Sequence, residues 1–151
     1  MLRRLLRAAV LGGAALALGA TAGCTGYSGS VSHQVTQWAS QYSVISNDST
    51  VIADVSAIRR SLKAGRLKDV TSNCAGLVDD AGTAYGNLPT PDNTLTNELN
   101  TAYQDFANAG GNCATLKALH GAKLSAALRT ISAGVAALAR ARQQLASDGV
   151  G

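Results

Sequence analysis

The chain has 151 residues, which is enough for one domain of ordinary size. Lysine and arginine exceed aspartate and glutamate by four, but three of these arginines stand within the first seven positions. Residues 24–151 carry ten cationic and nine acidic side chains, so a chain cleaved before residue 24 is nearly neutral. This balance gives little support to nucleic-acid binding, and we expect no nucleic-acid partner.

The amino terminus has the layout of a secretory signal peptide. Arg3, Arg4 and Arg7 form a basic segment, and an uncharged run of Ala, Val, Leu and Gly follows at 8–22. This run is short for a membrane-spanning helix, which needs about 20 apolar residues. No later stretch is comparably apolar, so we expect no membrane span in the rest of the chain.

Two cleavage sites compete at the end of the apolar run. Residues 21–24, Thr-Ala-Gly-Cys, resemble a bacterial lipobox, in which the cysteine is acylated and becomes the first mature residue; Thr21 stands where a lipobox usually has Leu. Cleavage after Ala22, at an A-x-A site, is the alternative and releases a secreted protein. We favour the lipoprotein, because plain secretion leaves Cys24 as an unexplained free thiol.

The lipoprotein interpretation predicts a location and a domain order. Residues 1–23 are the signal peptide, 24–30 a flexible tether, 31–147 the folded domain and 148–151 a C-terminal tail. Lipid on Cys24 places the protein on the extracytoplasmic face of the cell membrane, with the membrane itself as a partner.

Four stripes of apolar residues at alternating spacings of three and four predict four amphipathic helices. They run from Val31 through Ile45 to Leu62, from Leu67 to Leu88, from Leu95 to Cys113 and from Leu124 to Leu145. Short connections favour an all-α, antiparallel four-helix bundle. We expect the first helix to be long and continuous, with a kink near 47–49 allowed; a reversal of the chain at Asn47-Asp48-Ser49 is the alternative, because the stripe has a gap there.

The breaks between the stripes contain the residues that end helices. Gly65 can adopt the left-handed conformation after a helix end. Pro89 and Pro91 interrupt any helix between residues 86 and 94. Thr90, Asp92 and Thr94 are candidate N-caps for the following helix.

Cysteine content supports an exported protein with one disulfide. If Cys24 carries lipid, Cys74 and Cys113 remain as a pair, and thiols outside the cytoplasm tend to oxidise. Two buried free thiols are the alternative. We expect no metal site, because His33 and His120 have no ligand-like spacing to either cysteine.

The segment around this pair resembles a known pattern. Cys74, Leu77, Asp80, Ala84, Leu88-Pro89-Thr90-Pro91-Asp92, Leu95, Leu99, Ala102-Tyr103 and Cys113 resemble small secreted proteins and lipoproteins of mycobacteria and other actinobacteria. The resemblance covers roughly residues 70–113. It implies an exported four-helix domain with one disulfide and an unassigned function, and it brings no catalytic residues.

Two groups of residues are candidate binding sites. Arg59, Arg60, Lys63, Arg66 and Lys68 crowd one helix turn and form a possible anion-binding patch; a solvated bundle end is the alternative. Tyr85, Tyr103 and Phe106 are a possible pocket near the Pro-rich loop; core packing is the alternative.

No pattern of residues predicts an enzyme or a cofactor. The single glutamate, Glu98, and the lack of Glu-x-x-His exclude a carboxylate di-iron bundle. Asp79 and Asp80 are adjacent, so they diverge on a helix, and we expect a solvated face. Two functions remain: a non-enzymatic interaction or structural module that binds an envelope protein or an anionic wall component, or a carrier that holds a small molecule or lipid between its helices.

Overall fold

The structure is a computed structural model, and it describes residues 26–151. The signal peptide, the lipobox and Cys24 lie outside these residues, so they stay predictions. The described part of the chain consists of helices and contains no strand, which confirms the all-α prediction.

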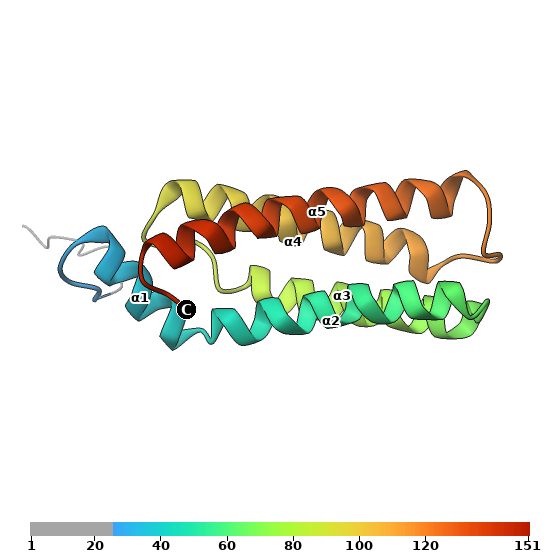
Figure 1. Ribbon diagram of the computed structural model, residues 1–151, viewed down its shortest axis with the longest axis horizontal. Helices are drawn as coiled ribbons and strands as arrows, with labels where there is room; N and C mark the ends of the chain where they lie inside the picture. The colour runs from blue at the N-terminus through green and yellow to red at the C-terminus, as the bar shows by residue number, and fades with distance from the viewer. Residues whose placement is uncertain (1–25) are drawn as a thin grey trace, which may run out of the picture.

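Five helices form the molecule, four of them long. α1 (Val31–Gln41) is short, whereas α2 (Val44–Lys63), α3 (Leu67–Tyr85), α4 (Asn93–Ala114) and α5 (Ala122–Ser147) lie alongside one another as an antiparallel bundle (Figure 1). The bundle therefore agrees with the predicted architecture, to which α1 is an addition.

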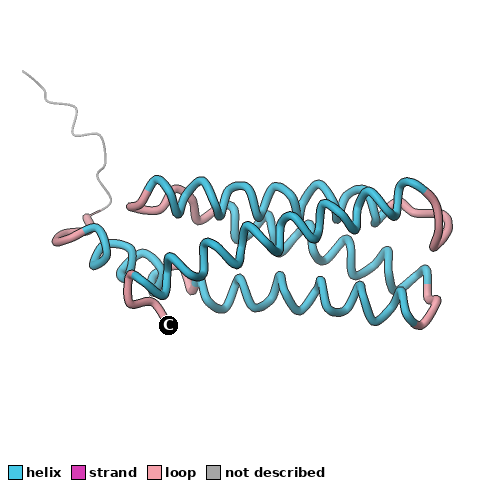
Figure 2. Tube along the Cα trace, turned by 45° about the horizontal axis from the view of Figure 1, so that its top comes forward, coloured by secondary structure: helices cyan, strands magenta, loops and turns pink. Residues whose placement is uncertain are grey.

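The bundle has two dissimilar ends. We call the end with α1, loop 86–92 and the C-terminus the near pole (Figure 1). The other end, with turn 64–66 and segment 115–121, is the distal pole (Figure 2). At the near pole, Trp38 Nε1 donates a hydrogen bond to the Asn87 carbonyl at 3.0 Å, and Ser32 Oγ donates one to Asp148 Oδ1 at 2.8 Å. These contacts attach α1 to the long helices.

The prediction of one long first helix is wrong. The helix ends at Gln41, and Ser43 adopts the left-handed conformation, with φ 51° and ψ 42°, before α2 begins. The chain neither kinks nor reverses at 47–49, which lies inside α2. The break at Ser43 shifts the helical phase, so Ile45, which we expected in the core, is 45% exposed. Val31, which we also expected there, is the first residue of α1 and is 50% exposed.

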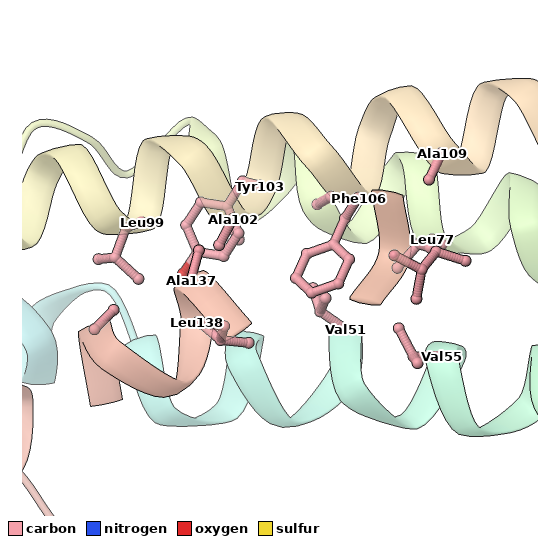
Figure 3. Packing of buried hydrophobic residues seen from close by; sticks show 14 of the residues in the cluster. Val51, Val55, Leu77, Leu99, Ala102, Tyr103, Phe106, Ala109, Ala137 and Leu138 are labelled. Atoms are coloured by element: carbon pink, nitrogen blue, oxygen red, sulfur yellow. The ribbon is translucent and has the colours of Figure 1, made fainter. Parts of the chain in front are cut away.

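The buried stripe of α2 contains an acidic residue. Its core positions are Val44, Asp48, Val51, Val55 and Ile58. Asp48 thus fills the gap that we read as a possible break. The stripes of α3 and α4 agree with the prediction, and Figure 3 shows Phe106 of α4 pointing toward Val51 of α2 within the core.

The helix ends use the residues that the sequence indicated. Gly65 takes a positive φ of 66°, and the amides of Gly65 and Arg66 donate to the carbonyls of Leu62 and Ser61, which is a Schellman motif. Asp92 caps α4, since its carboxylate accepts from the Leu95 amide at 2.7 Å.

Helices α3 and α4 approach each other closely near the disulfide. Cys74 and Cys113 form the predicted disulfide, with their Cα atoms 5.8 Å apart. Nearby, a Cβ on Gly110 would lie 2.7 Å from Val78 Cγ2 and 2.8 Å from the Cys74 carbonyl oxygen. Only glycine fits this approach.

α5 is more apolar than we expected of any stretch that follows the signal peptide. It is the one helix in residues 26–151 that is long and apolar enough to cross a membrane, judged by length and composition alone. In the bundle it packs along α4, and Ile131, Leu138 and Leu145 lie in the core.

Candidate binding groove at the distal pole

The five predicted cations lie at the distal pole and are all exposed. The structure divides them among different surroundings. Arg59, Arg60 and Lys63 project from the last turns of α2 and border a groove between α2 and α5. Arg66 instead pairs with Asp69 at 3.0 Å, and Lys68 lies on α3.

The groove has an apolar floor and a cationic rim. Its volume is about 460 Å³, and it is open to solvent. Val55 and Ile58 of α2 and Ile131 of α5 are buried at its base, while Leu62 and Leu128 are half-buried at its sides. The groove exists because α2 and α5 touch at few points, whereas α2–α3, α3–α4 and α4–α5 pack along their lengths.

Charge is separated along the bundle. Segments 59–69 and 117–129, at the distal pole, hold eight of the ten cationic side chains in residues 26–151 and one of the nine acids. Asp69 is that acid. The remaining described residues carry two arginines and eight acids, so a nearly neutral molecule has a strongly cationic end.

Tyr85, Tyr103 and Phe106 do not surround a common pocket, which corrects our interpretation. Phe106 is fully buried and Tyr103 is 2% exposed, because both fill the core on the inner face of α4. Tyr85, at the end of α3, is 44% exposed. Core packing therefore explains Tyr103 and Phe106.

Tyr103 belongs to a buried polar network that sequence reasoning missed. Its hydroxyl donates to Asp48 Oδ1 at 2.7 Å, and Arg142 Nε donates to Asp48 Oδ2 at 3.3 Å. Burial raises the pKa of Asp48, and the bonds from Tyr103 and Arg142 oppose that rise. The network joins α2, α4 and α5 in the near half of the bundle. The predicted stripe does not include position 48, so the sequence offered no signal for this network.

A pair of carboxylates lies between α2 and α3. Burial, followed by the hydrogen bond and charge of Asp80, raises the pKa of Asp54 to about 6. Asp54 Oδ2 is buried without a hydrogen-bond partner among the described residues. Asp80 is thus half-buried and faces Asp54, whereas we expected it on a solvated face with Asp79.

Neither carboxylate group is part of a metal site in the described residues. Across residues 26–151, no three or more His, Cys, Asp or Glu side chains gather as ligands would. His120 is exposed in segment 115–121. The groove and its cationic rim are therefore the best candidate for a functional site.

Comparisons with known proteins add no assignment. The chain matches no protein-family model, no curated protein and no solved structure. The resemblance to actinobacterial secreted proteins and lipoproteins accordingly remains a prediction, and the function must be argued from the chain itself.

Proposed function

We propose that this chain is an exported, lipid-anchored module of the bacterial cell envelope that acts without catalysis. It binds an anionic polymer of the envelope through its distal pole, while lipid on Cys24 holds the near pole at the membrane. An envelope protein with an acidic surface is the other kind of partner that such a pole can meet.

The separation of charge along the bundle is the observation that carries the proposal. Eight cations and one acid gather in two segments of a molecule whose other described residues are net acidic. Such a field attracts polyanions to one end and repels them from the other. An even distribution of the same side chains would give no preferred end.

The position of the tether supports the same assignment. Residues 26–30 precede α1 at the near pole, and α2 then carries the chain through 20 residues toward the distal pole. At 1.5 Å per residue this is about 30 Å. The Debye length at physiological salt is about 8 Å, so a membrane beneath the tether is screened from the distal cations. With the near pole held at the membrane by the proposed lipid, the distal cations would face away from it, toward the envelope.

The test uses the full chain with Cys24→Ala, exported so that the disulfide forms, and immobilised polyglycerol phosphate. The neutral-rim variant carries Arg59→Gln, Arg60→Gln and Lys63→Gln. Each cation near an anionic surface contributes about 1 kcal/mol, so we expect roughly hundredfold weaker binding. Equal binding by the two proteins contradicts the proposal.

A matched control separates location from net charge. Ser40→Glu, Ser46→Glu and Gln143→Glu lower the net charge by the same three units, at exposed positions near the opposite pole. This near-pole variant should bind the polymer almost as well as the Cys24→Ala protein. If it loses as much affinity as the neutral-rim variant, overall charge rather than the distal pole determines binding.

The groove favours a second candidate function, the carrier. Its volume of about 460 Å³ lies within the range of small-molecule sites, which is about 300–1,000 Å³. A polymer of charged groups binds to polar surroundings, so the apolar floor of the groove favours a ligand that is itself partly apolar.

A further inference from the structure

We propose that the groove between α2 and α5 binds a single-chain amphiphile, with the apolar chain on the groove floor and the anionic head group at Arg59, Arg60 and Lys63. The inference rests on the second candidate function, the carrier, and names its ligand class. It does not require that the distal pole bind a polymer.

In the distal half of the bundle, α2 and α5 do not approach each other closely, and we call the interface between them the seam. The disulfide and Gly110 bring α3 against α4. Gly134 does the same for α4 and α5, since a Cβ there would lie 3.0 Å from Phe106 Cε1. The ion pair that joins α2 to α5, between Asp48 and Arg142, lies in the near half. The distal half of the seam can therefore accept a ligand without any of these contacts being broken.

The floor suits a hydrocarbon chain. Leu62 and Leu128 are half-buried at its sides, above a base of Val55, Ile58 and Ile131 that is itself at most 2% exposed. Taking about 30 Å³ per group, as for a water molecule, a volume of about 460 Å³ holds roughly 15 groups of methylene size. This is the size of one medium-length chain, and its binding would remove from water chiefly the ligand's own apolar surface, together with the exposed parts of Leu62 and Leu128.

The rim suits an anionic head group. Three cations and the hydroxyl of Ser132 border the groove, and no acid lines it. Within residues 26–151, none of these three cations forms an ion pair, unlike Arg66, Arg140 and Arg142. A carboxylate or phosphate at the rim would receive charge-assisted hydrogen bonds, which are about twice as strong as neutral ones.

Two other occupants fit less well. The lipid expected on Cys24 attaches next to the near pole, and the groove begins at Val55, 11 residues along α2, about 17 Å from its start. A second copy of the chain, packed symmetrically over the groove, would set three cations against three cations. An anionic amphiphile is complementary to both the floor and the rim.

The experiment measures binding of laurate to the Cys24→Ala protein below the critical micelle concentration, by calorimetry at pH 8. We expect one laurate per chain. Dodecanol, which has the chain but no charge, should bind about tenfold more weakly, the equivalent of one hydrogen bond to a charged group. Inorganic phosphate, which has the charge but no chain, should not compete measurably with laurate.

Variants assign the binding to the groove. The neutral-rim variant should bind laurate about tenfold more weakly and dodecanol unchanged. Leu128→Trp should block both ligands, since an indole occupies the groove. Ser132→Trp, at an exposed position of the lining, repeats the test if Leu128→Trp does not fold.

The outcomes separate this inference from polymer binding. The tryptophan variants, whose indole fills the groove, should lose laurate binding and keep their affinity for polyglycerol phosphate. Laurate binding that persists in both tryptophan variants, or that is equal for laurate and dodecanol, overturns the inference. If the Cys24→Ala protein binds laurate normally but does not bind polyglycerol phosphate, only the first proposed function is contradicted.

Discussion

Gly110 and Gly111 are adjacent in α4, yet they should respond in opposite ways to the same substitution. A Cβ on Gly110 would lie 2.8 Å from the Cys74 carbonyl oxygen and 2.7 Å from Val78 Cγ2. A Cβ on Gly111 would meet nothing within 4 Å. Both positions are helical, so the intrinsic gain from replacing glycine by alanine is the same at each.

The size of the destabilisation by Gly110→Ala depends on which atoms must move to make room for the new methyl group. Carbon contacts are optimal at about 3.5–4.0 Å, so the new methyl group at 110 needs roughly 0.7 Å of additional room. The obstructing oxygen is backbone, and the disulfide at Cys74 prevents α3 from separating from α4 at that level. Overpacking of this kind costs about 1–3 kcal/mol, whereas the helical gain is about 0.5–1 kcal/mol.

We therefore expect Gly110→Ala to destabilise the protein by up to about 2.5 kcal/mol and Gly111→Ala to stabilise it by about 0.5–1 kcal/mol. Urea unfolding with the disulfide intact measures both free energies, and equal slopes would show that the denatured state is unchanged. If Gly110→Ala is as stable as Gly111→Ala, the helices are not as close as the structure places them, and the reasoning fails.

Three further predictions concern the disulfide, the buried acid pair and the anchor. Reducing Cys74–Cys113 should lower the free energy of unfolding by up to about 4 kcal/mol, the chain-entropy value for a separation of 39 residues; unchanged urea midpoints with and without reductant would argue against a stabilising link. The pKa of Asp54 is raised to about 6, so its contribution to stability is present near pH 4 and is lost as pH rises through 6. Asp54→Asn should accordingly melt at a higher temperature than the unsubstituted chain at pH 7.5 and at a similar temperature at pH 4; identical melting profiles at both pH values would refute the raised pKa. Cys24 should be acylated, and Cys24→Ala should move the protein from the membrane fraction to the medium; an intact mass that starts at residue 23 without lipid would rule the anchor out.

Helices α3 and α4 could be predicted from the sequence because nothing disturbs their period. Leu77, Leu99 and Phe106 stand at regular three- and four-residue spacings, and each is fully buried. Their ends carry residues with a local mechanism, such as Asp92, whose carboxylate caps α4. The capping residues and the apolar spacing indicate the same helices, so α3 and α4 could be predicted from the sequence.

The first helix could not be predicted because its break has no local signal. Ser43 takes a left-handed conformation that serine rarely adopts, and Asn47 Nδ2 donates to the Tyr42 carbonyl across it at 2.9 Å. The direction of α1 also depends on the bond from Trp38 to the Asn87 carbonyl, which joins residues 49 positions apart and has no signal in the local sequence. The apparent gap at 47–49 misled for a related reason, since Asp48 is buried by partners on two other helices.

The candidate site was predictable only in part. The run from Arg59 to Lys68 shows the cluster of cations directly. The groove depends on how far α2 lies from α5, two helices that are distant in sequence, and helical period carries no information about that separation. The same limit explains the aromatic residues, since period places Tyr103 on a buried face without showing that Asp48 is its partner.

Anion binding at the distal pole can be mapped by following amide chemical shifts as polyglycerol phosphate is titrated into the isotope-labelled Cys24→Ala protein. We expect the largest changes in segments 59–69 and 117–129, where eight cations gather. Amides of α1 and loop 86–92, at the near pole, should stay unchanged. Changes centred on the near pole, or spread evenly over all five helices, would contradict a distal anion-binding end.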